Sequence, residues 1–142
     1  MGDFLRAVGA LPSEKRDWTP GAPARSALDQ LKEVAFAPQL YRLLIAENRM
    51  PSPEEHSQMK SEVQSIEGFD KICELAMKNT SELCNHIAEF PNDQLEKEVT
   101  LPFGGGMTVT MADVLAIHYW NTVYHQGQVN FIQMLLGDGE MH

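Results

Sequence analysis

Four polar side chains interrupt apolar helical stripes in this sequence: Glu33, His118, Asn121 and His125. With one helical turn every ~3.6 residues, the last three fall on the apolar face of the segment 111–136. Glu33 heads a second stripe, in which apolar residues follow at +3, +4, +7 and +11. A carboxylate in such a position is costly without a partner, so Glu33 needs a metal ion, a histidine or water beside it.

Two helices must position these side chains. Ser26 is a good N-cap, and the apolar spacing after it predicts a helix over 27–47. Thr110 and Asp113 form a second capping signature before the most apolar helix, 111–136. The opposite side of that helix is apolar too, and a helix that is apolar all round is buried all round. In a chain of this size, that pattern predicts a homodimer interface along the last helix.

The rest of the chain supplies shorter elements around these two helices. We expect a short helix at residues 3–10, a polar helix at 52–66 and a longer amphipathic helix at 69–90. A small β-hairpin with a glycine turn (Gly104–Gly106) should follow at 96–110. Four long helical segments with short links are typical of an antiparallel four-helix bundle. The sequence therefore predicts an all-α fold with a hairpin before the last helix, as a single domain over residues 1–142.

The composition excludes several classes of protein. With 142 residues, of which 43% are hydrophobic and 22% charged, the chain is typical of a globular domain and not of a disordered one. Eleven basic residues against 20 acidic ones give a net charge of −9, which disfavours binding to nucleic acid or to acidic membranes. No apolar run approaches the ~18 residues of a membrane span. We therefore expect a soluble, cytoplasmic protein.

The two cysteines are not placed for a disulfide. Cys73 and Cys84 lie eleven residues apart in the predicted helix 69–90, which separates them by about 16 Å along the axis. A disulfide requires Cα atoms within ~7 Å. Both cysteines fall on the apolar stripe of that helix, so the spacing predicts two small buried thiols.

Three stretches of the chain resemble the DinB/YfiT-like superfamily. They are WTP at 18–20, SALDQLKE at 26–33 and NTVYHQGQ at 121–128, the last followed by LLGD at 135–138. The resemblance covers nearly the whole chain. It implies a four-helix bundle, often dimeric, in which three histidines bind a divalent metal ion. It also implies a metal-dependent enzyme, since some members of the family are transferases or isomerases that use low-molecular-weight thiols.

By position, the family's three metal-binding histidines fall on Glu33, Asn121 and His125, so only the third is a histidine here. His118, one turn before Asn121, is a candidate substitute, although it lies about 10.5 Å along the helix axis from His125. These residues would form a site of nitrogen and oxygen ligands for Zn²⁺, Ni²⁺, Mn²⁺ or Fe²⁺. With three ligands the ion would keep an open position, which activates a water molecule or holds a substrate thiolate.

The same residues also suit a metal-free network. Glu33 could accept a hydrogen bond from His125 across the bundle, with Asn121 and Gln128 completing the network. Two functions therefore stay open. One is a metal-dependent transferase or hydrolase that acts on a small molecule or a low-molecular-weight thiol. The other is a non-catalytic dimeric bundle that serves in small-ligand binding or structure. A truncated copy, whose short first helix leaves one face of the bundle uncovered, is a third interpretation.

Overall fold

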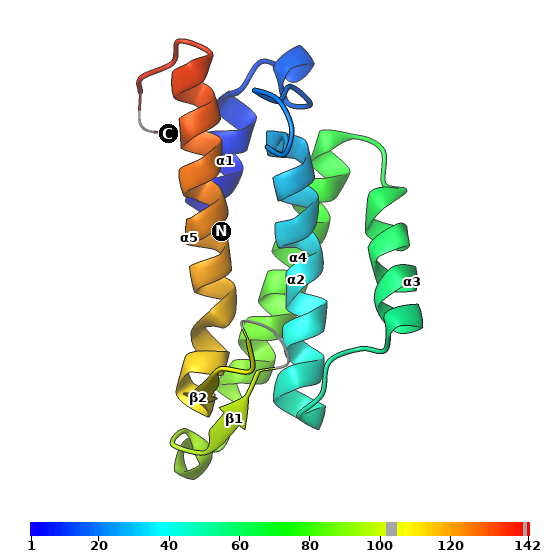
Figure 1. Cartoon of the computed structure of the whole chain (residues 1–142), viewed down its shortest axis with the longest axis vertical. Coiled ribbons are helices and arrows are strands. Elements are labelled where there is room, and N and C mark those ends of the chain that lie inside the picture. The colour runs from blue at the N-terminus through cyan, green and yellow to red at the C-terminus, as the bar shows by residue number, and fades with distance from the viewer. Residues whose placement is uncertain (102–104, 141) are drawn as a thin grey trace.

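The computed structural model describes residues 1–101, 105–140 and 142 (Figure 1). In these residues it contains five α-helices: α1 (Gly2–Ala10), α2 (Ala27–Glu47), α3 (Pro53–Gln64), α4 (Phe69–Ala88) and α5 (Met111–Leu135). Strands β1 (Glu98–Thr100) and β2 (Thr108–Thr110) pair antiparallel, and short 3-10 helices occupy Ser13–Lys15 and Asn92–Gln94. The predicted all-α fold with a small hairpin before the last helix is confirmed.

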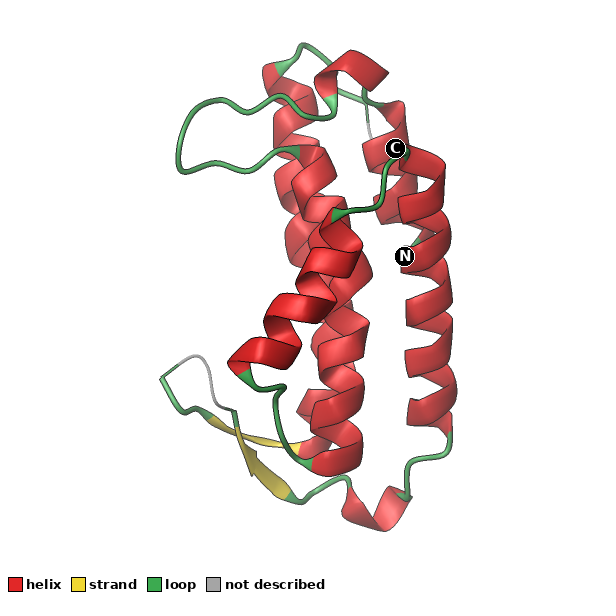
Figure 2. Ribbon diagram, turned by 90° about the vertical axis from the view of Figure 1, so that its right-hand side faces the viewer, coloured by secondary structure: helices red, strands yellow, loops and turns green. Residues whose placement is uncertain are grey.

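Helix α2 lies at the centre of the domain. It packs against α4 and α5, while α3 packs mainly on α2 and α1 packs on α5 and α2. The four long helices alternate in direction along the chain, so α5 runs opposite to α2 (Figure 1). The early residues of α2 therefore lie beside the late residues of α5, which allows Glu33 to face His125. Figure 2 shows the hairpin at the end of the domain where α2 finishes and α5 begins.

Side-chain caps fix where the long helices begin. Ser26 Oγ accepts a hydrogen bond from the Asp29 backbone N–H at 3.1 Å at the start of α2. Thr110 and Asp113 form a capping box at the start of α5, as the sequence predicts. Each such cap stabilises a helix by about 0.5–2 kcal/mol. Because the caps set the first residue of α2 and of α5, they also set the direction in which Glu33 and His125 point.

The core consists of two apolar clusters that meet near the middle of α2. One cluster joins α1, α2, α4 and α5 around Phe4, Leu31 and Val129. The other joins α2, α4, α5 and the hairpin around Leu44 and Val114. Buried polar side chains, which include Gln30, Asn79, His118, Thr122 and His125, come from α2, α4 and α5. The helices that form the apolar core therefore also carry the buried polar groups.

The glycine turn of the hairpin lies partly outside the described residues, because Gly104 is not among them. Gly105 and Gly106 both have a φ of +78°. Glycine adopts this left-handed conformation without the steric penalty that a side chain would add. The turn residues therefore match the hairpin that the sequence predicts.

The structure corrects the expectation that both cysteines are buried. Cys73 is half-buried and Cys84 is exposed, and both thiols are free. The outward face of α5 is also exposed in the single chain, with Trp120 and Tyr124 each at 64% exposure. This happens because α3 and α4 cover α2 and leave the outer side of α5 without a neighbouring helix. None of the described helices is long and apolar enough to cross a membrane.

Candidate metal centre

Glu33 and His125 meet across the contact between α2 and α5. Glu33 Oε1 lies 3.0 Å from His125 Nε2. The side chain of His125 is 3% exposed, whereas that of Glu33 is 38% exposed. The pair therefore has a rigid imidazole inside the protein and a carboxylate that reaches solvent. The sequence predicted this contact, and the structure confirms it.

Gln30 fixes the orientation of the imidazole. Its Oε1 lies 3.1 Å from His125 Nδ1, and the residue is 2% exposed. A carbonyl oxygen can only accept, so Nδ1–H donates to Gln30, and in the neutral ring Nε2 then presents its lone pair to Glu33. A carboxylate is also an acceptor, so a proton or a cation must lie between Oε1 and Nε2. Histidines that bind metal ions usually donate their second ring N–H in this way.

Arg25, in the loop before α2, completes the surroundings of Glu33. Its guanidinium forms an ion pair with Glu33 Oε2 and donates to the backbone carbonyl of Asp29 at 2.9 Å. The hydrogen bond with His125 lowers the pKa of Glu33 to about 2, with Arg25 adding to this effect against partial burial, which raises the pKa. Glu33 is therefore an anion at all physiological pH values. A cation that binds Glu33 Oε1 and His125 Nε2 together takes the place of the proton that lies between them.

A pocket of about 600 Å³ opens in front of Glu33, between α2 and α3, and we call it the Glu33 pocket. Asn121 of α5 lines it, and its buried Oδ1 has no hydrogen-bond partner in the described part of the chain. Tyr41 also lines it, and burial, together with the charge of Glu33, raises the pKa of its phenol to about 12. The pocket thus presents a carboxylate and a phenol that stays protonated, and its lining includes Asn121, whose Oδ1 is shielded from solvent.

The structure does not bring His118 to the Glu33–His125 pair. His118 Nε2 lies 3.0 Å from Thr80 Oγ1 of α4, and its Nδ1 has no partner among the described residues. It lines a separate pocket of about 360 Å³ between α4 and α5, together with Cys84. Burial lowers the pKa of His118 to about 4. Within the described residues, no three histidine, cysteine, aspartate or glutamate side chains are grouped so that they could hold a metal ion.

The residues around Glu33 nevertheless fit a divalent ion in two respects. In octahedral coordination, two neighbouring ligands at about 2.1 Å lie about 3.0 Å apart, and Glu33 Oε1 and His125 Nε2 have this separation, which is also that of a hydrogen bond. Asn121 lines the same pocket, and its buried Oδ1 lacks a partner among the described residues, so it is the candidate third ligand. The resulting set has one nitrogen and two oxygens and no thiolate, which suits Zn²⁺, Ni²⁺, Mn²⁺ or Fe²⁺.

The sequence did not identify Gln30 or Arg25 as members of this site. Gln30 precedes Glu33 by three residues, so it lies on the same side of α2, and a polar residue there could have been noticed. Arg25 lies in an irregular segment, where no periodicity predicts the direction of a side chain. In the described residues, Gln30 and Arg25 make the contacts that were expected of Asn121 and Gln128 in the hydrogen-bond network. That part of the expectation is wrong.

Comparison with known proteins places this chain in a family. The family model of the DinB superfamily matches residues 2–129, so the chain belongs to the DinB superfamily. A comparison with curated proteins found no match.

Two crystal structures show the same fold. The first is a mycothiol-dependent maleylpyruvate isomerase, with a TM-score of 0.69 and 15% sequence identity, over 90% of this chain and 55% of that chain. The second is a DinB-like protein from Bacillus subtilis, with a TM-score of 0.55 and 13% identity, over 99% of this chain and 89% of that one. This chain spans little more than half the length of the isomerase.

Proposed function

We propose that this DinB-superfamily protein binds a divalent metal ion through Glu33, His125 and Asn121 and is a metal-dependent transferase, isomerase or hydrolase that uses a low-molecular-weight thiol. The observation that carries the proposal is the 3.0 Å separation of Glu33 Oε1 and His125 Nε2, with Gln30 behind the imidazole and an open pocket in front of the carboxylate. The fold that the chain shares with a mycothiol-dependent isomerase supports it. When bound, such an ion acts as a Lewis acid and lowers the pKa of a coordinated water or thiol.

The residues around the ion have separate roles in this proposal. Gln30 holds the His125 ring with Nε2 toward Glu33. Arg25 keeps Glu33 in place and balances its charge. Tyr41, protonated at neutral pH, offers a hydrogen bond to a polar group of the substrate in the Glu33 pocket.

Two measurements test the proposal. The first is elemental analysis of untagged protein that was purified without chelator, and the second is a thermal melt before and after addition of EDTA. We expect about one metal ion per chain, and a melting temperature that falls by roughly 10 °C when the ion is removed, because an ion present at about 100 times its Kd stabilises the fold by ~2.7 kcal/mol. Glu33→Gln keeps the shape of the side chain and should lose most of the metal. A metal-free protein whose melt does not respond to EDTA would overturn the proposal.

A second function is favoured by a specific feature of the site. Glu33 already forms an ion pair with Arg25 and a hydrogen bond with His125, so its charge is balanced without an ion. The protein would then be a non-catalytic helical domain that binds a small ligand in the Glu33 pocket. In that case Glu33→Gln should weaken the contact with Arg25 and destabilise the fold equally with and without added metal.

We also propose that two copies associate through α5. Trp120, Tyr124 and Phe131 are 64%, 64% and 54% exposed on its outer side, and no charged residue occurs between Asp113 and Asp138. An uncharged aromatic face lets two copies of a protein with net charge −9 approach without local repulsion. Light scattering after gel filtration should give a dimer, which Trp120→Glu dissociates. The control, Met77→Glu, changes an exposed residue of α4 and should leave the dimer intact.

A further inference from the structure

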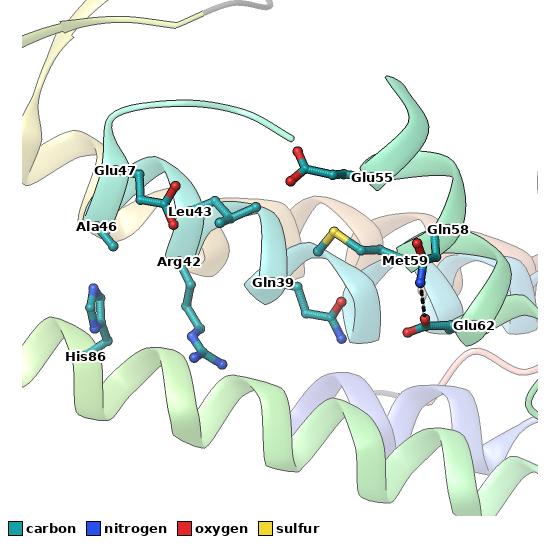
Figure 3. Close-up of a pocket in the computed structure, with 10 residues that line it drawn as sticks. All are labelled: Gln39, Arg42, Leu43, Ala46, Glu47, Glu55, Gln58, Met59, Glu62 and His86. Carbon is teal, nitrogen blue, oxygen red and sulfur yellow. Dashed lines mark hydrogen bonds between the residues drawn. The ribbon is translucent and has the colours of Figure 1, made fainter. Parts of the chain in front are cut away.

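Two pockets lie between α2 and α3, and they differ in charge. The first, which we call the Arg42 pocket, has a volume of about 490 Å³ and contains three glutamates, Glu47, Glu55 and Glu62 (Figure 3). Arg42, its one arginine, forms an ion pair with Glu82 at 2.6 Å. Glu47 and Glu55 are both paired with Arg49. Arg42 is therefore already neutralised, and the arginine that pairs with Glu47 and Glu55 lies outside the pocket lining.

The Glu33 pocket has the opposite character. Besides Arg25, it is lined by two lysines, Lys32 of α2 and Lys60 of α3. No carboxylate oxygen of the described residues lies within 4.0 Å of either ammonium group. Among the lysines of the described residues only Lys78 has such a partner, so what sets Lys32 and Lys60 apart is that they line the same pocket. Asp29 and Glu33 also line the pocket, so three cations stand against two carboxylates and the lining has a formal charge of +1.

Lys32 has no carboxylate partner in the described residues, and a hydrogen bond to α3 fixes its position. It is half-buried, and its Nζ donates a hydrogen bond to the backbone carbonyl of Gln64, at the end of α3, at 3.1 Å. An ammonium group has three donors, so two remain for another partner. Among the described residues its hydrogen-bond partner is a neutral carbonyl, so this ammonium group has no counter-ion within 4.0 Å. An anion bound at this place would supply the missing charge.

Part of the pocket wall is apolar. Phe36, Leu40 and Val63 line it, and the His56 ring meets the edge of Phe36 at a centroid distance of 5.2 Å. Pockets of about 300–1,000 Å³ with apolar walls and a few placed polar groups are typical of small-molecule sites. A ligand there would place an apolar body on these side chains, with an anionic group at one end.

We propose that the Glu33 pocket binds a small organic acid, whose carboxylate is held by Lys32 and Lys60 and whose apolar body packs on Phe36, Leu40 and Val63. Glu33, Asn121 and Tyr41 complete the lining of the pocket around it. This inference names the class of substrate for the proposed metal site. That the bound acid reacts there rests on the proposed function, whereas its binding to the pocket does not. It predicts discrimination by charge, because an amide of the same shape cannot pair with the lysines.

Calorimetric titration with three carboxylates, benzoate, 4-phenylbutyrate and hexanoate, and with the amide of each, tests this proposal. We expect at least one carboxylate to bind about tenfold or more tightly than its amide, and to weaken as the ionic strength rises. Lys32→Met and Lys60→Met keep the aliphatic stems and should each remove most of that preference, whereas Lys32→Arg should retain it. Lys71→Met, on α4 and outside the pocket, is the matched control, and circular dichroism checks that each variant is folded.

The titrations are made with EDTA-treated protein and with metal-loaded protein, so that the two proposals can fail separately. A carboxylate preference in a protein that binds no metal would support the organic-acid site and overturn the metal function. A protein that binds metal but binds carboxylate and amide equally would overturn the organic-acid site alone. The organic-acid site would also be overturned if none of the three carboxylates bound at millimolar concentration, or if Lys71→Met lost the preference for carboxylate as much as Lys32→Met does.

Discussion

His118 and His125 lie two turns apart on the same helix, and both are buried, but their surroundings are different. His125 has a hydrogen-bond partner at each ring nitrogen, Gln30 on one side and the Glu33 carboxylate on the other. His118 has one partner, the hydroxyl of Thr80, and its second nitrogen has none in the described part of the chain. The pKa of His118 falls to about 4 because burial disfavours its charged form.

This difference teaches which buried histidine can bind a cation. A metal ion needs an oriented lone pair and an anion to balance its charge, and α2 supplies both to His125 through Gln30 and Glu33. Helix α4 faces His118 with a neutral hydroxyl, so a cation there would remain uncompensated. The partner helix, and not the histidine itself, therefore decides the chemistry. The predictions below test this contrast from the largest expected effect to the smallest.

The largest effect should come from removing one histidine at a time. We expect His125→Ala to reduce the metal content from about one ion per chain to less than about a tenth, because it removes the only imidazole of the site. His118→Ala should keep nearly all of the metal. Elemental analysis of both variants, after circular dichroism has checked their folding, makes the measurement. An equal loss of metal in the two variants would break the contrast.

The pH dependence of stability should separate the two sites next. Folding lowers the pKa of His118 from its usual 6.5 to about 4, so the unfolded chain takes up a proton first as the pH falls. The contribution of His118 to the free energy of unfolding should be constant above about pH 6.5. It should fall by about 3 kcal/mol between pH 6.5 and 4 and stay level below pH 4.

Urea unfolding at several pH values measures this dependence. His118→Gln cannot titrate and should flatten the curve between pH 6.5 and 4. Glu33, whose pKa is lowered from 4.5 to about 2, contributes stability that is lost only at lower pH, between about 4.5 and 2. A curve that keeps its full slope in His118→Gln would show that another group is responsible.

Removing the acceptor behind His125 should have an intermediate effect. Gln30→Met leaves the Nδ1–H of His125 without a partner and frees the ring to rotate, so we expect metal affinity to fall about 10- to 100-fold. Gln30→Glu, which keeps the acceptor, should retain or strengthen binding. Competition with a chelator of known affinity gives the Kd values. Unchanged affinity in Gln30→Met would mean that the ring orientation does not depend on this hydrogen bond.

The smallest effect belongs to the neutral partner of His118. Thr80→Val removes one hydrogen bond from a half-buried contact, and we expect it to lower the free energy of unfolding by about 1 kcal/mol. The metal content should not change. Paired urea titrations and elemental analysis of this variant and of Gln30→Met should therefore give opposite patterns, with stability affected in one and metal affinity in the other.

Much of the fold could be predicted from the sequence because the signals are local. Ser26 and Thr110 cap helices within three residues, and apolar periodicity gives the extents of α2 and α5 within a residue. Glu33 and His125 stood out because a charged or polar residue in an apolar stripe needs a partner. Periodicity gives only the face on which each residue lies, so the pairing of His118 with Thr80 of α4 could not be derived.

Other parts of the site depend on how separate elements pack. Arg25 reaches Glu33 from an irregular loop, and Lys32 and Lys60 meet at one pocket because α3 folds back onto α2. No spacing within a single helix encodes these contacts. The exposure of Trp120 and Tyr124 also depends on how the helices pack, because none of the described helices covers the outer side of α5.

Anomalous X-ray scattering from crystals grown with Zn²⁺ or Mn²⁺ tests the central claim most directly, because it locates the ion independently of the stability of any variant. The account predicts one strong peak in contact with both Glu33 and His125, beside Asn121, and no peak at His118. A peak at His118, or no peak between Glu33 and His125 at saturating metal, would contradict it.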